Sequence, residues 1–152
     1  MSVSIGDPAP VFELANQYRE PVSLDKLRGT KGLVVFIPYP FTGVCTGEVC
    51  AIRDHLAELS LLDAEVMVVT THAAQTNRAW ADANELAFDV LADYWPHGAV
   101  AQAYGAFNEV LGVANRVTFV LDGDLVVRDV IATDSLGIGR EFDTYIAALA
   151  AI

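Results

Sequence analysis

PYPFTGVCTGEVC, residues 38–50, follows an apolar run, Gly32–Ile37, that predicts a buried strand. Proline, threonine and glycine after such a run are typical of a turn into a helix, and Thr42 with Gly43 supplies residues that favour a helix N-terminus. Cys45 is therefore predicted in the first turn of that helix. The rest of the chain is expected to be organised around this strand, turn and helix.

The predicted position of Cys45 has a chemical consequence. The first backbone N–H groups of a helix lack partners inside the helix, and the positive end of the helix dipole lies there, so a thiolate is favoured over a thiol. A cysteine in such surroundings is a candidate nucleophile. The alternative is a small buried apolar side chain, which is the commonest state of a free cysteine. Position alone leaves both interpretations open.

Strands and helices are predicted to alternate on both sides of this unit. Val11–Leu14 with a turn at Asn16–Gln17 predicts a short hairpin, and Ser23–Arg28 predicts a capped helical turn closed by Gly29. The further strands are predicted over Glu65–Thr70, Phe88–Leu91, Arg116–Leu121 and Leu125–Ile131, the last two joined by the hairpin signal Asp122-Gly123-Asp124. The further helices are predicted over Ala74–Asn84, Trp95–Tyr104 with Pro96 in its first turn, and Arg140–Ala151.

This order of elements predicts an α/β sandwich in which helices flank a mixed central sheet, as in the thioredoxin-like fold. The helix that carries Cys45 should turn one face inward, because apolar residues recur at spacings of three and four. That face comprises Cys45, Val49, Ile52, Leu56 and Leu59. With 152 residues, no repeat and no linker-like composition, residues 1–152 are expected to form a single domain.

Composition and charge exclude several function classes. A net charge of −11, from 9 basic and 20 acidic residues, argues against nucleic acid and anionic membranes as partners, because phosphate binding needs a basic patch. No apolar stretch approaches the length of a membrane span, and the start MSVSIGDPAP has neither a basic nor an apolar signal region, so a cytoplasmic protein is expected. Two cysteines fit redox or catalytic use better than a disulfide scaffold.

A longer pattern surrounds Cys45. Pro38, Thr42, Cys45 and Glu48 stand in the order P-x-x-x-T-x-x-C-x-x-E, which resembles the active-site signature of the peroxiredoxins. The resemblance covers nearly the whole chain, and the stretches RDHL, DYWPHG and GVANRVTFV are most similar to the alkyl hydroperoxide reductase E group, whose members mostly use one peroxidatic cysteine. Further matching residues are Gly6–Pro10, Phe12, Leu24, Gly29, Ala103–Gly105 and Asn115–Val120. A thioredoxin-like fold is implied.

The resemblance also implies roles for the matching residues. Pro38 ends the strand and would shield the sulfur without adding an N–H donor. The Thr42 hydroxyl would contact a peroxide oxygen, and Arg116 would stabilise the thiolate and bind the peroxide. Glu48 is expected to orient arginines and other donors, with a solvated first-turn glutamate as the alternative. For Arg116 the alternative is a strand-end arginine paired with a surface acid.

The implied reaction is that of a thiol-dependent peroxidase. Cys45 would reduce hydrogen peroxide or an organic hydroperoxide and become a sulfenic acid, with no metal and no organic cofactor. Expected partners are the peroxide, a thiol reductant such as thioredoxin, a glutaredoxin-like protein or a low-molecular-weight thiol, and a second copy in a homodimer. The alternative function is a redox-regulated sensor of the same fold, in which oxidised Cys45 is recognised by a partner without turnover.

Cys50 departs from the one-cysteine pattern. Its spacing from Cys45 matches the bacterioferritin-comigratory or Q-type peroxiredoxins, in which the second cysteine resolves the sulfenic acid. On an intact helix, Cα atoms five residues apart are roughly 8–9 Å apart, beyond the ~7 Å limit for a disulfide. Resolution by Cys50 therefore requires unwinding, which Gly43 and Gly47 would favour. Otherwise an external thiol would reduce Cys45.

Aromatic residues next to the signature are candidates for the substrate pocket. Tyr39 and Phe41 lie in the turn between the strand and the Cys45 helix. Aromatic side chains of this kind are also common in cores and interfaces.

Overall fold

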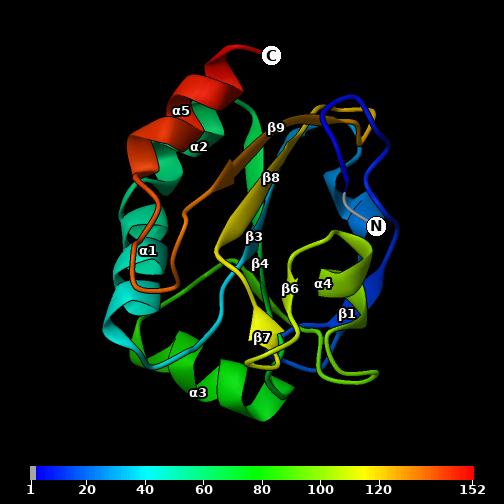
Figure 1. Ribbon diagram of the computed structural model, residues 1–152. Coiled ribbons are helices and arrows are strands. Elements are labelled where there is room, and N and C mark those ends of the chain that lie inside the picture. Colours follow the sequence, from blue (N-terminus) through cyan, green and yellow to red (C-terminus); the bar gives the residue numbers. More distant parts are fainter. Residues whose placement is uncertain (1–2) are drawn as a thin grey trace.

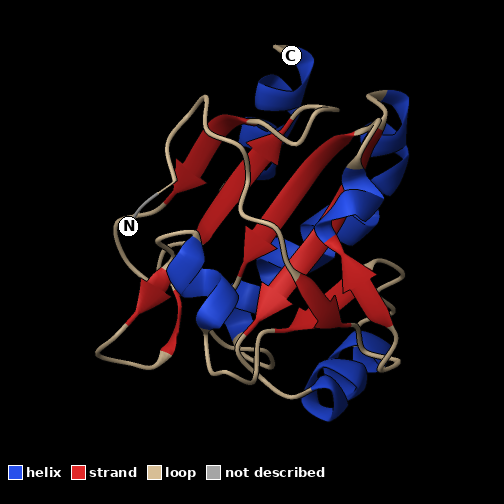
Figure 2. Cartoon of the chain, turned by 90° about the vertical axis from the view of Figure 1, so that its right-hand side faces the viewer, coloured by secondary structure: helices blue, strands red, loops and turns tan. Residues whose placement is uncertain are grey.

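The computed structural model describes residues 3–152, and within them the largest feature is a mixed sheet of seven strands in the order β2-β1-β5-β4-β3-β8-β9 (Figure 2). Strands β3, β4 and β5 are parallel, and β8 runs antiparallel to β3. The bounds are Glu13–Ala15 for β1, Pro21–Ser23 for β2, Lys31–Phe36 for β3, Ala64–Thr70 for β4, Asp89–Ala92 for β5, Val117–Leu121 for β8 and Val127–Ala132 for β9. The two remaining short strands, β6 (Phe107–Asn108) and β7 (Val113–Ala114), pair with each other.

Helices cover both faces of the sheet. In Figure 1, α1, α2 and α5 lie on one side, whereas α4 and the N-terminal segment lie on the other. The bounds are Leu24–Leu27 for the 3₁₀ helix η1, Gly43–Asp54 for α1, Leu56–Leu61 for α2, Ala74–Ala83 for α3, Ala99–Ala103 for α4 and Phe142–Ala150 for α5. Each face has its own apolar core, one containing Cys45, Trp80 and Leu149 and the other Leu24, Tyr104 and Phe119. The predicted α/β sandwich with a thioredoxin-like arrangement is confirmed.

Strand β3 sets the position of the Cys45 helix. Residues Leu33–Phe36 of β3 are apolar and fully buried, since the strand lies between β4 and β8 in the middle of the sheet, where both faces are covered. The ladder continues to Ile37, whose N–H donates to the carbonyl of Val69 at 3.0 Å. The chain then leaves the sheet at Pro38, so the turn and the start of α1 lie at the carboxyl end of a rigid, buried strand.

The helix that carries Cys45 is shorter than predicted. Its inward face was expected to continue through Leu59, but α1 ends at Asp54 and α2 begins at Leu56. At the junction, His55 has a non-helical ψ of 21°, and its ring stacks on Phe142 of α5 at 4.6 Å. Its Nδ1 lies 2.7 Å from the Ala51 carbonyl. This break between α1 and α2 thus accompanies tertiary and side-chain contacts that periodicity does not reveal.

Two further boundaries were wrong. The helix predicted over Trp95–Tyr104 begins at Ala99, because Gly98 has a left-handed φ of 68° and leaves no space for a side chain beside the ring of Phe107. The closing helix begins at Phe142 and not at Arg140. The β6–β7 pair was not predicted, since two-residue strands are too short to show an alternating pattern. No helix within residues 3–152 has the length and apolar character needed to cross a membrane.

Candidate active site

Cys45 lies in the first turn of α1, as predicted. Thr42 is the N-cap residue, and its carbonyl accepts the first helical hydrogen bond, from Thr46, at 2.9 Å. The Cys45 side chain is 0% exposed and packs in the core between α1 and the sheet. Its Sγ accepts a hydrogen bond from the backbone N–H of Tyr39 at 3.4 Å. This main-chain donor was not foreseen from the sequence, because a backbone amide leaves no residue-type signal.

The segment that leads into the helix is held by its own hydrogen bonds. The Thr42 hydroxyl donates to the carbonyl of Tyr39 at 2.7 Å. The backbone N–H and C=O of Tyr39 thus contact Cys45 and Thr42, respectively. Pro38 is buried, and Tyr39 packs against the cluster that contains Cys45. Phe41 has a φ of 68° and is 58% exposed. Of the two pocket candidates, only Tyr39 thus contacts the core around the sulfur.

Glu48 is buried one turn after Cys45 and is not the solvated glutamate of the alternative interpretation. Its Oε1 accepts a hydrogen bond from Nη1 of Arg116 at 2.6 Å. Arg116 precedes β8 and is itself buried, and its Nε donates to the Leu136 carbonyl at 2.6 Å. Arg116 therefore pairs with a buried acid and not with a surface one.

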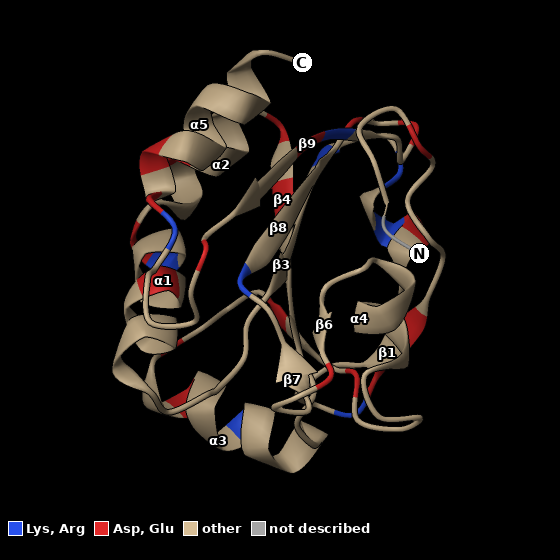
Figure 3. Cartoon of the chain, in the orientation of Figure 1, with Lys and Arg blue, Asp and Glu red and all other residues tan. Residues whose placement is uncertain are grey.

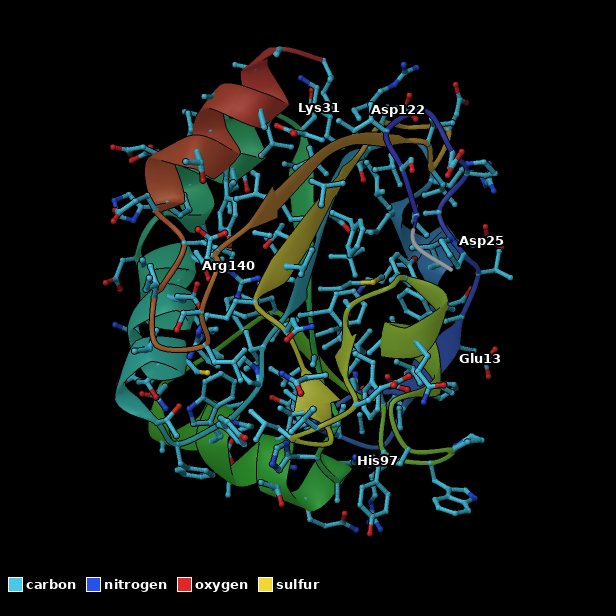
Figure 4. All side chains as sticks on the ribbon, in the orientation of Figure 1. Glu13, Asp25, Lys31, His97, Asp122 and Arg140 are labelled. Carbon is cyan, nitrogen blue, oxygen red and sulfur yellow. The ribbon has the colours of Figure 1, made fainter. Side chains whose placement is uncertain are left out.

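A second arginine, Arg140, completes the surroundings of Glu48 and was not recognised in the sequence. Its Nε and Nη2 donate to the two Glu48 oxygens at 2.8 and 3.0 Å, and its backbone N–H donates to Oε2 at 2.6 Å. Figure 4 shows Arg140 between the helices on one face and strands β8 and β9. Arg140 was predicted at the start of the closing helix. The only signal in the sequence was that a buried Glu48 would need positively charged partners, and this does not specify which arginine.

The contacts of Arg140 continue to two hydroxyl groups. Its Nη1 donates to Oγ1 of Thr118 on β8 at 3.0 Å, and that oxygen lies 3.0 Å from the hydroxyl of Tyr145 on α5. Thr118 and Tyr145 are both buried. We call the set Arg116, Glu48, Arg140, Thr118 and Tyr145 the Glu48 network.

The charges of this network are unbalanced without the sulfur. Burial acts to raise the pKa of Glu48, but hydrogen bonds and charges from Arg140 and the charge of Arg116 outweigh it and hold the pKa below its ordinary value of 4.5. Burial acts to lower the pKa of Arg140, yet Glu48, Tyr145 and Cys45 together raise it. Two cations and one carboxylate leave one positive charge buried, and a thiolate at Cys45 would neutralise it.

Acidic residues elsewhere do not gather into one surface. Figure 3 shows Asp and Glu on helices, strands and loops around the sheet. Among residues 3–152, no group of three or more His, Cys, Asp or Glu side chains is arranged to hold a metal ion. The site combines a buried thiol with a buried arginine pair on Glu48, of which Arg140 interacts electrostatically with Cys45.

Cys50 lies on the same helix but in different surroundings. It is partly exposed, and its Sγ is 3.7 Å from Oδ1 of Asn84, the C-cap residue of α3. Arg53 donates to the Asn84 carbonyl at 2.7 Å and so lies beside the same residue. Both cysteines are free thiols, and α1 is continuous between them.

The chain is similar to known proteins in both sequence and structure. The model of the AhpC/TSA family matches residues 5–130. Alkyl hydroperoxide reductase E of Mycobacterium tuberculosis is 43% identical over 127 residues, which cover 83% of each chain. A putative peroxiredoxin bcp of Haemophilus influenzae is 36% identical over 70% of this chain and 68% of its own length. Among solved structures, Peroxidoxin BcpB from Mycobacterium tuberculosis superposes with a TM-score of 0.86 at 29% identity, covering 99% and 98% of the two chains.

Proposed function

The chain belongs to the AhpC/TSA family of peroxiredoxins and is a thiol-dependent peroxidase, and we propose that Cys45 is the residue that reacts with the peroxide. One observation carries this assignment. Cys45 is the cysteine that lies at a helix N-terminus beside a buried network with one excess positive charge, whereas Cys50 is partly exposed five residues further along α1.

The proposed step is a displacement on oxygen. The Cys45 thiolate attacks one peroxide oxygen, the O–O bond breaks, and the leaving oxygen takes a proton to become water or an alcohol. The sulfur is oxidised to a sulfenic acid while the peroxide is reduced. Negative charge spreads over the sulfur and both oxygens in the transition state, so fixed cations and N–H donors stabilise it more than the bound substrate.

The surrounding residues take complementary roles in this proposal. Arg116 and Arg140 provide the positive charge, and Glu48 holds both guanidinium groups in place. The Tyr39 amide donates to the sulfur, and Thr42 is available to the peroxide after its hydroxyl leaves the Tyr39 carbonyl. Buried Pro38 and the Tyr39 side chain provide the apolar surroundings of the sulfur, whereas the exposed Phe41 could contact a peroxide only from the outside. Because Cys45 is fully buried, the covering side chains must move before hydrogen peroxide or an organic hydroperoxide reaches it.

Two routes can return the sulfenic acid to the thiol. In the first, the Cys50 thiol attacks the oxidised sulfur, water leaves, and a disulfide forms that a thioredoxin or glutaredoxin-like protein reduces. In the second, a low-molecular-weight or protein thiol attacks Cys45 directly. The first route requires α1 to unwind between the cysteines, because residues five apart on a helix are roughly 8–9 Å apart.

The assembly and location of the protein are also proposed. Four of the exposed apolar side chains lie in two segments that a contact of His97 joins, since its Nε2 lies 2.7 Å from the Gly112 carbonyl. We call the set Tyr94, Trp95, Val110 and Leu111 the Trp95 patch. A homodimer that covers this patch, a single domain over residues 1–152, and a place in the cytoplasm fit these features and the two free thiols.

Intact mass and turnover test the proposed function together. After one equivalent of hydrogen peroxide, the loss of two hydrogens and of both thiols, with a Cys45–Cys50 cross-link, would identify resolution by Cys50. A gain of one oxygen with Cys50 free would identify resolution by an external thiol. Cys45→Ser is expected to abolish peroxide consumption, and a variant that retains it would exclude Cys45. Oxidation of Cys45 in a single turnover, with no cycling by any thiol, would instead support the sensor.

A further inference from the structure

The Glu48 network extends beyond the ion pairs of Glu48, and its remaining members, Thr118 and Tyr145, have no role in the proposed function. Arg140 follows β9 and precedes α5, in a segment without regular secondary structure. A guanidinium on such a segment has several rotatable bonds, so its position depends on the groups that it contacts. The contacts of each nitrogen therefore decide whether its charge is fixed near Cys45.

Glu48 fixes two of the three guanidinium nitrogens. Nε and Nη2 of Arg140 pair with the two carboxylate oxygens in the planar, two-bonded arrangement that arginine forms with carboxylates. The third nitrogen, Nη1, cannot reach the same carboxylate in that geometry. It donates to Thr118 Oγ1, and the Thr118 side chain is fully buried.

The Thr118 hydroxyl is itself held by Tyr145. An arginine can only donate, so Thr118 Oγ1 accepts from Arg140, and it also shares a hydrogen bond with the Tyr145 hydroxyl in which either oxygen can donate. Tyr145 is buried, and its ring packs edge-on against Phe142 with centroids 6.0 Å apart. A fixed phenol on α5 thus fixes a hydroxyl on β8, which in turn fixes the guanidinium.

We infer that Thr118 and Tyr145 are positioning residues for peroxide reduction, acting through Arg140, and that they connect the C-terminal helix to the active site. This inference rests on the proposed role of Cys45. Neither hydroxyl is assigned contact with the peroxide. Their effect is to hold one arginine where its charge stabilises the reacting sulfur and oxygens, with no reorganisation during the reaction.

Four variants test this inference, each characterised by the rate constant for Cys45 oxidation by hydrogen peroxide and by the urea midpoint of unfolding. Thr118→Val keeps the shape but removes both hydrogen bonds, and we expect the rate constant to fall about tenfold or more, as for one lost bond to a charged group. Thr118→Ser restores the hydroxyl, and its rate constant should return to within about threefold of the wild type. Tyr145→Phe keeps the ring and should lower the rate constant about two- to fivefold.

Thr70→Val is the matched control. Thr70 is a fully buried threonine on β4 whose hydroxyl bonds to Asn77, away from the Glu48 network. It should lower the urea midpoint as Thr118→Val does, with a rate constant within about twofold of the wild type. A Thr118→Val rate constant equal to that of the wild type, no recovery in Thr118→Ser, or an equal loss in Thr70→Val would overturn the inference. Unreactive Cys45 in the wild-type protein would instead refute the proposed function.

Discussion

Glu48 and Arg140 form a two-bonded ion pair across 92 residues of sequence, with Nε to Oε2 at 2.8 Å and Nη2 to Oε1 at 3.0 Å. Both side chains are almost completely shielded from solvent. The pair joins α1 to the segment before α5, and Arg116 contacts the same carboxylate. Removing this buried carboxylate is costly, because two buried guanidinium groups would then have no counter-charge.

Glu48→Gln should both destabilise the protein and slow its reaction. A neutral amide leaves two buried guanidinium groups without a counter-charge, so the free energy of unfolding should fall by ~3–5 kcal/mol. Urea unfolding measures this change, and stopped-flow oxidation should be slower as the arginines lose their orientation. Asp82→Asn is the matched control, since the Arg78–Asp82 pair is exposed on α3. The free energy of unfolding of this control should stay within ~1 kcal/mol of the wild type. An equal loss of stability in both variants would contradict a special role for Glu48.

Acid should weaken the protein partly through Glu48. The pKa of Glu48 in the folded protein lies below its ordinary value of 4.5, so the folded state binds this proton less readily than the unfolded state. Its contribution to stability is therefore present above pH 4.5 and is lost as the pH falls below that value. Urea unfolding from neutral pH downward should show the difference between wild type and Glu48→Gln becoming smaller. A constant difference would mean that the Glu48 pKa is not lowered.

Arg116→Ala should slow Cys45 oxidation by about two orders of magnitude, the usual effect of removing one fixed donor to a developing charge. Glu48 remains paired with Arg140 in this variant, so the fold should persist. Arg116→Lys keeps the charge but cannot contact both the Glu48 carboxylate and the Leu136 carbonyl in the same geometry. An intermediate rate constant is expected for it. If Arg116→Ala were oxidised at the wild-type rate, Arg116 would be structural.

Gly47→Ala should slow disulfide formation without changing the first oxidation. A Cβ at Gly47 would meet no atom within 4 Å, so the folded helix accepts alanine. Alanine favours the helix by ~1 kcal/mol over glycine, and unwinding between Cys45 and Cys50 becomes about fivefold rarer. Quenched-flow mass spectrometry measures both steps. Disulfide formation at an unchanged rate would show that opening of α1 does not limit resolution, and the Cys50→Ser variant identifies any disulfide that does not involve Cys50.

Trp95→Glu should separate a homodimer that covers the Trp95 patch. Trp95 is 82% exposed in the isolated chain, and a buried carboxylate at this place would oppose association. Light scattering coupled to gel filtration is expected to show a dimer for the wild type and a monomer for the variant. Leu61→Glu is the control, since Leu61 on α2 is 85% exposed but lies outside the patch. If Leu61→Glu became a monomer while Trp95→Glu stayed a dimer, the interface would lie at α2 and not at the Trp95 patch.

Much of the site could be predicted from local sequence. The apolar run before Pro38 specifies a strand buried on both faces, and Thr42-Gly43 specifies the start of the next helix. Both signals are contained in a few consecutive residues, because a buried strand has a run of apolar residues and a turn into a helix has residues such as threonine and glycine. They place Cys45 in a first helical turn without knowledge of any long-range contact.

Other features depended on tertiary contacts. The break at His55 coincides with its stacking on Phe142, and the late start of α4 reflects the approach of Phe107 to Gly98. Each involves a contact with a residue of another element, and hydrophobic periodicity does not encode such contacts.

The sequence by itself therefore determined the strand, the turn and the helix that carry Cys45, together with the family to which the chain is similar. Only the tertiary structure decided which cations surround Glu48. Arg116 and Arg140 lie 68 and 92 residues from that carboxylate, and Arg140 was expected to begin a helix. Their selection follows from desolvation, because a buried carboxylate must be paired, and only packing brings these two arginines within reach.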